Sequence, residues 1–180
     1  MNLQKTWRNN SKVNNITNRL PTILFIVYLI ALSWILLFKL GVRFSYMGDR
    51  RVNLIPFSEP LILDGENILN VVIFVPLGIY AGILFERWNF GKKLFLIFLI
   101  SLLVEGLQFI LAVGAFDITD IITNTLGGIT GLMIFKAIEK AFNNSVKAQK
   151  FITIVAAIGT VIMILFLLLL KMNMLPVRYQ

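Results

Sequence analysis

Residues 94–114 read LFLIFLISLLVEGLQFILAVG, and residues 115–135 read AFDITDIITNTLGGITGLMIF. Each segment has the roughly 20 residues that an α-helix needs to cross a bilayer. Five polar residues interrupt the apolar sequence: Glu105, Gln108, Asp117, Asp120 and Asn124. A carboxylate near the bilayer centre costs about 2.5–3.5 kcal/mol on insertion scales, so such residues usually face a partner, a cavity or a substrate. We therefore expect a functional site at these five residues.

The composition is that of an integral membrane protein. Hydrophobic residues make up 58% of the 180 residues, charged residues make up 14%, and the mean hydropathy is +0.83. The expected fold class is therefore all-α, a polytopic bundle of transmembrane helices. The chain has neither Cys nor His, which excludes disulfides, thiolate nucleophiles, and the commonest general base and metal ligand. No catalytic residue, cofactor or metal site is predicted.

The net charge of +8 is also consistent with a membrane protein. Lys and Arg lie in the segments that flank the apolar stretches, where the positive-inside rule and anionic lipid headgroups favour them. The expected partners are therefore membrane lipids, and nucleic acid is not expected. The loops on the same side as the N-terminus carry most of these residues, which predicts a cytoplasmic N-terminus.

Five stretches approach the length of a transmembrane helix. They are residues 20–38, 67–85, 94–113, 118–138 and 151–170. In the second, Pro76 and Gly78 indicate a kink with close packing. In the fourth, the spacing of Gly127, Gly128 and Gly131 lets a neighbouring helix approach closely.

The chain accordingly divides into three regions. Residues 1–19 form a basic cytoplasmic segment, residues 20–138 a core of four transmembrane helices, and residues 139–180 a cytoplasmic linker, a fifth transmembrane helix and a short tail. The first apolar run is too long for a signal peptide and no small-residue cleavage site follows it, so we expect it to be retained.

The long connection at residues 41–66 differs from an ordinary solvated linker. It contains Arg43, Arg50 and Arg51, followed by the apolar motif NLIPF at residues 53–57. A basic cluster beside such a motif predicts a first external loop that dips partly into the membrane and returns onto the bundle.

The polar residues of the two quoted segments are expected to face each other. Glu105 and Gln108 share one helix face, and Asp117, Asp120 and Asn124 share another. The short turn between the segments makes the two helices antiparallel neighbours. With a rise of about 1.5 Å per residue from that turn, Gln108 comes level with Asp120, and Glu105 with Asn124.

We therefore predict one polar ligand-binding pocket that is open to the outer leaflet. Its residues come from the external loop, the start of the second span and the two quoted segments: Arg50, Arg51, Asn53, Asn67, Asn70, Glu105, Gln108, Asp117, Asp120 and Asn124. A structural alternative is that these side chains only hydrogen-bond to one another and fix the helix register. Asp117 has a further alternative as the N-cap of the fourth span, with Asp120 three residues later.

Ordered motifs in this region resemble a known family. They are NLIPF (53–57), NILN (67–70), FVPLG (74–78), EGLQ (105–108) and DITDIITNTLG (117–127) with Gly131. In this order they resemble the VanZ-like membrane proteins, a family associated with resistance to teicoplanin, a glycopeptide antibiotic. The resemblance implies a protein of the bacterial cell envelope that lowers susceptibility to such antibiotics.

Two positions depart from the family pattern. Residues 113–116 (VGAF) stand where the family often has an Arg before Asp117, and Thr119 stands where it often has Asp. If a buried Arg normally compensates the carboxylates, Arg50 or Arg51 has to do so here, or one acid stays protonated.

Three functions stay open. The favoured one is a non-enzymatic protein that binds a lipid headgroup, a lipid-linked cell-wall precursor or a lipoglycopeptide, with arginines holding its phosphate or carboxylate. The second is an intramembrane enzyme in which Glu105 and Asp120 act as acid and base or bind a Mg²⁺-like ion. The third is a small transporter or flippase that uses the same two residues. Whether the chain forms a homo-oligomer through Gly127 and Gly131 is also open.

Overall fold

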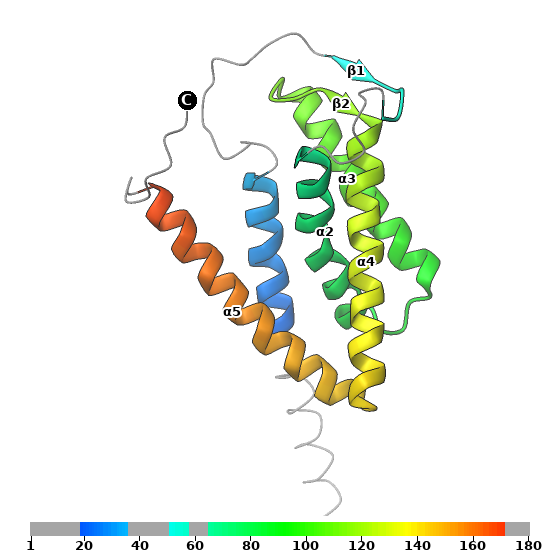
Figure 1. The fold of residues 1–180 in the computed structure, drawn as a ribbon, viewed down its shortest axis with the longest axis vertical. Coiled ribbons are helices and arrows are strands. Elements are labelled where there is room, and N and C mark those ends of the chain that lie inside the picture. The colour runs from blue at the N-terminus through cyan, green and yellow to red at the C-terminus, as the bar shows by residue number, and fades with distance from the viewer. Residues whose placement is uncertain (1–18, 36–50, 58–64, 172–180) are drawn as a thin grey trace, which may run out of the picture.

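The computed structural model describes residues 19–35, 51–57 and 65–171. In these ranges the chain is an all-α bundle, which confirms the predicted fold class. Its helices are Arg19–Ile35, α2 (Gly65–Leu84), α3 (Phe90–Ile110), α4 (Ile118–Phe142) and α5 (Ser145–Lys171). Two short strands, β1 (Val52–Asn53) and β2 (Phe116–Asp117), lie together at one end of the bundle (Figure 1).

Each predicted span overlaps one of these helices, and residues 36–38 of the first span lie outside the described ranges. Within the described ranges, α2, α3 and α4 are long and apolar enough to cross a membrane, and Arg19–Ile35 is a shorter apolar helix. Figure 1 shows α5 running diagonally across the bundle from the end of α4.

Capping residues set helix ends that hydropathy places differently. α3 begins before residue 94 because Asn89 is its N-cap, accepting a hydrogen bond from the backbone N–H of Lys92 at 2.9 Å. α4 continues beyond residue 138 to its C-cap, Asn143, which has a left-handed backbone with φ of 50°. Lys residues in these end turns lower the local hydropathy, so a span predicted from hydropathy leaves the turns out. The turns are still helical because Lys is a good helix former.

Glycines allow α2 and α4 to pack backbone against backbone. A Cβ on Gly127 would overlap the carbonyl oxygen of Val71, and one on Gly131 would overlap that of Val75. Gly78 of α2 meets the backbone of α4 in the same way. The glycine face of α4 is therefore covered by α2 of the same chain.

The third helix packs on another side of α4. The side chain of Ile97 fills the space where a Cβ on Gly128 would lie. Phe74, Leu77 and Leu132 are also buried in this region, with exposures of 0%, 0% and 2%. These contacts hold α2, α3 and α4 together as the part of the bundle that carries the polar residues.

The segment 51–57 lies against the bundle at the turn between α3 and α4. β1 pairs in parallel with β2, with Asn53 opposite Asp117. The backbone N–H of Phe116 also donates to the carbonyl of Arg51 at 3.0 Å. The apolar side chains that follow, Leu54 and Ile55, are exposed on this end of the bundle.

Candidate functional site

Asp117 begins α4 and joins it to the 51–57 segment. Its Oδ1 accepts a hydrogen bond from the backbone N–H of Thr119 at 2.7 Å, so Asp117 is the N-cap of α4. Its Oδ2 accepts a second one from Nδ2 of Asn53 at 2.9 Å. Asn53 in turn accepts from the backbone N–H of Ile55 at 3.1 Å, which holds the segment in a turn. The capping role considered from the sequence is therefore combined with a contact to the 51–57 segment.

Glu105 of α3 lies against the start of α4. Its side chain is only 1% exposed, and its Oε2 accepts a long hydrogen bond of 3.4 Å from the backbone N–H of Asp117. The N-terminus of a helix carries a partial positive charge, which stabilises a nearby carboxylate. The fold therefore provides an electrostatic reason for a buried acid at this position.

Asp120 connects α4 to α2. Its Oδ1 accepts a hydrogen bond from Nδ2 of Asn70 at 2.8 Å. Asn70 is buried at 7% exposure, whereas Asp120 is half-buried. This contact brings the NILN motif of α2 against the acidic motif of α4.

Thr119, one of the two positions singled out above, has a defined hydrogen-bonding role. Its Oγ1 accepts a hydrogen bond from the backbone N–H of Phe57 at 3.1 Å. An Asp carboxylate would offer the same kind of acceptor. Thr119 therefore offers an acceptor to the 51–57 segment, as Asp would.

Two buried polar side chains lie deeper in the bundle and lack hydrogen-bond partners. Ser101 of α3 and Asn124 of α4 are both 0% exposed, and neither the Ser101 hydroxyl nor either polar atom of the Asn124 amide is paired. Ile97 of α3 packs on Gly128 of α4. Because the two helices are antiparallel, Ser101, four residues after Ile97, lies at the same height as Asn124, four residues before Gly128. The sequence analysis missed Ser101, although it lies one helical turn from Glu105 on the same face.

Gln108 lies at the end of α3, next to the turn. Its side chain is 5% exposed, and its backbone carbonyl accepts from the N–H of Val113 at 3.0 Å. A Cβ added to Gly114 would lie 3.6 Å from the Cβ of Gln108. The turn therefore packs directly on this side chain.

The remaining predicted residues occupy the edge of the site or fall outside the description. Asn67 is half-buried near the start of α2, and Arg51 is exposed. Arg43 and Arg50 lie outside the described residues. Arg51, one of the two arginines considered as a partner of the acids, is therefore exposed and not buried beside them.

We call the residues that the structure gathers here the polar cluster. They are Asn53, Asn70, Ser101, Glu105, Gln108, Asp117, Asp120 and Asn124. The cluster offers carboxylate and amide groups that can bind hydroxyl or amine groups of a ligand. Among the described residues there is no group of three or more Asp, Glu, His or Cys residues arranged to hold a metal ion.

Comparisons with known proteins point to one family. The VanZ/LLP1 family model matches residues 25–139, which include the whole polar cluster. The protein VanZ of Enterococcus faecium is 36% identical over 154 residues, covering 83% of this chain and 94% of the relative. No solved structure matches this chain.

Proposed function

This chain belongs to the VanZ/LLP1 family, and we propose that it binds the polar headgroup of a lipid-anchored molecule at the outer leaflet of the bacterial cell membrane. The ligand class comprises a lipid headgroup, a lipid-linked cell-wall precursor or a lipoglycopeptide. Binding there lowers susceptibility to teicoplanin-type antibiotics by changing how the drug engages the membrane surface.

The observation that carries this proposal is the unpaired state of Ser101 and Asn124. A buried polar group without a hydrogen bond costs about 1–3 kcal/mol, and native proteins contain few of them. Polar residues that serve only to join helices would be paired with each other, as Asn70 and Asp120 are. The free Asn124 amide and Ser101 hydroxyl instead suit a ligand hydroxyl or amine, or a water molecule that a ligand displaces.

The arrangement around these groups supports recognition of a headgroup rather than of a hydrocarbon. Asp120 and Glu105 lie closer to the end of the bundle than Asn124 does, and their carboxyl oxygens can accept hydrogen bonds from an amine or a sugar hydroxyl. The exposed Arg51 lies on the external segment and adds a positive charge at the same end. With the N-terminus in the cytoplasm, this end of the bundle faces outward.

The sharpest test replaces Asn124 with Leu, which has a similar shape but no polar atoms. Because the Asn124 amide has no partner in the protein, removing it is expected to keep or raise stability. Teicoplanin and vancomycin susceptibility would be measured in a host that expresses the wild type or the variant at equal membrane levels. We expect wild-type protection against teicoplanin, and a return to the unprotected level for Asn124→Leu.

Thr130→Val is the matched control. Thr130 is also on α4, is exposed and bonds only to the carbonyl of Leu126 at 2.9 Å, so this variant is expected to protect fully. Full protection by a well-folded Asn124→Leu variant would refute the role of the polar cluster in binding. Absence of protection by the wild type itself would refute the resistance function.

A further inference from the structure

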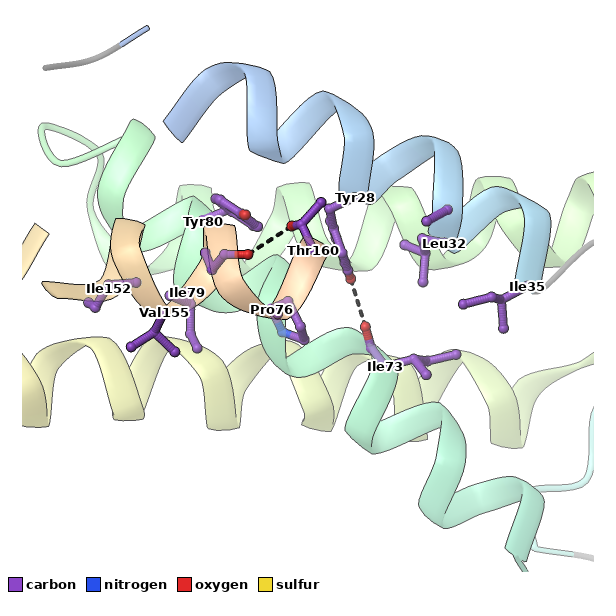
Figure 2. A pocket seen from close by; sticks show the side chains of 13 residues that line it. Tyr28, Leu32, Ile35, Ile73, Pro76, Ile79, Tyr80, Ile152, Val155 and Thr160 are labelled. Carbon is purple, nitrogen blue, oxygen red and sulfur yellow. Dashed lines mark hydrogen bonds between the residues drawn. The ribbon is translucent and has the colours of Figure 1, made fainter. Parts of the chain in front are cut away.

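A second site lies away from the polar cluster, between the helix Arg19–Ile35, α2 and α5. It is a groove of about 380 Å³, lined by residues of all three helices (Figure 2). We propose that this groove binds a single hydrocarbon chain of a membrane amphiphile. The proposal does not depend on which headgroup the polar cluster binds.

The walls of the groove favour an apolar occupant. The lining is aliphatic apart from two tyrosines and one threonine, and its aliphatic members include Leu32, Ile79 and Ile152. The Tyr28 hydroxyl already donates to the carbonyl of Ile73 at 2.7 Å. The hydroxyl of Thr160 donates to its own helix, to Ala156, at 2.8 Å. Apolar surface is therefore what the groove presents.

The depth of the groove identifies the occupant as hydrocarbon. Pro76 and Ile79 of the lining lie in the middle of the apolar stretch Asn67–Leu84 of α2. At that depth the surrounding solvent is lipid chains. Val155, on the groove wall, is 52% exposed, so the groove is accessible from the lipid side.

Local sequence preforms this space. Pro76 lacks a backbone N–H, which interrupts the hydrogen-bond ladder of α2, and Tyr28 binds a carbonyl of the same turn. On the opposite wall, Gly159 has no atom within 4 Å of the position of an added Cβ. Taking about 30 Å³ for each methylene, as for a water molecule, the volume fits about a dozen chain carbons.

The test uses the purified full-length protein in lipid nanodiscs. Two probes are added in separate experiments: palmitic acid with a mid-chain diazirine, and phosphatidylglycerol in which one chain is this labelled palmitate. Photolysis followed by peptide mass spectrometry locates the labelled residues. We expect labelling to concentrate on the groove residues, and excess unlabelled lipid to abolish it. Competition by free palmitic acid would indicate that one chain suffices, and competition by phosphatidylglycerol alone would indicate that the chain enters as part of a phospholipid.

Gly159→Phe fills the groove, and Ile162→Phe is the matched control on a residue of α5 that does not line it. Groove labelling is expected to fall at least five-fold in Gly159→Phe and to stay unchanged in Ile162→Phe. Val155→Phe at the rim is a second blocking variant, for use if Gly159→Phe fails to elute as a folded protein. Equal labelling in blocked and control variants, or labelling spread evenly over all exposed apolar residues, would overturn the proposal.

Discussion

Gly131 lies at a close contact between α4 and α2, and its replacement by Ala is expected to destabilise the bundle. The added Cβ would overlap the carbonyl oxygen of Val75 and would lie 3.0 Å from both Gly78 Cα and the backbone nitrogen of Ile79. All three obstructing atoms belong to the backbone of α2. No side-chain rotation relieves the overlap, so the two helices have to separate.

Overpacking a well-filled interior typically costs about 1–3 kcal/mol, and the rigidity of the obstructing atoms puts this substitution at the upper end. The change also adds the higher helix propensity of Ala, which is worth up to about 1 kcal/mol. Gly106→Ala is the matched control because it carries the same propensity gain, and no atom lies within 4 Å of its added Cβ. The difference between the two variants therefore isolates the helix contact.

The assay is thermal unfolding of the purified protein in one detergent, followed by circular dichroism. A chain of 150–250 residues shifts its Tm by about 2–4 °C per kcal/mol, so a contact cost near 3 kcal/mol predicts a Tm for Gly131→Ala about 6–12 °C below that of Gly106→Ala. If the two variants melt at the same temperature, α2 does not pack on Gly131 as described. A large loss of stability in Gly106→Ala would equally contradict the packing around α3.

Two further predictions concern the orientation and the helix cap. The chain has no Cys, so a single introduced cysteine reports on which side of the membrane it lies. In intact cells, a membrane-impermeant maleimide is expected to label Ala115→Cys and to label Gly91→Cys only after the cells are lysed. The reverse pattern would place the polar cluster on the cytoplasmic side. Asp117→Ala is expected to lower stability by about 1 kcal/mol through loss of the N-cap. Asp117→Asn keeps an acceptor for the Thr119 N–H but loses the second carboxylate oxygen, which accepts from Asn53, so its Tm is expected to lie between those of Asp117→Ala and the wild type; equal losses in the two variants would contradict the capping role.

Hydropathy was sufficient to predict where the helices lie, because a helix in lipid needs a long apolar stretch whatever other helices it packs against. The ends were less predictable. Asn89 and Asn143 terminate helices by local backbone geometry, and a hydropathy window does not detect a cap. The register between α3 and α4 was also misplaced by about one helical turn, because residues 111–117 were counted as helical rise. In the structure this stretch is mostly turn and strand, so Glu105 contacts the start of α4 rather than Asn124.

The contact between the 51–57 segment and α4 could be expected only in outline. A basic and apolar loop suggested a return to the bundle, but the partners are far apart in sequence: Asn53 bonds to Asp117, and Phe57 to Thr119. Two-residue strands have no periodicity that could reveal them. The polar residues of α2 to α4 were easier to find, because charges and amides inside apolar spans are rare.

The structural interpretation of the polar cluster explains most of its members but not all of them. Asn70 and Asp120 join two helices, and Asp117 caps one of them and bonds to the 51–57 segment. A cluster with no other purpose would bury apolar residues in the remaining positions, because an unpaired polar group in a dry interior only destabilises the fold. Ser101 and Asn124 are such groups. In the proposed function a polar ligand group that binds between α3 and α4 offsets this cost, and the Asn124→Leu variant therefore separates a structural cluster from a binding site.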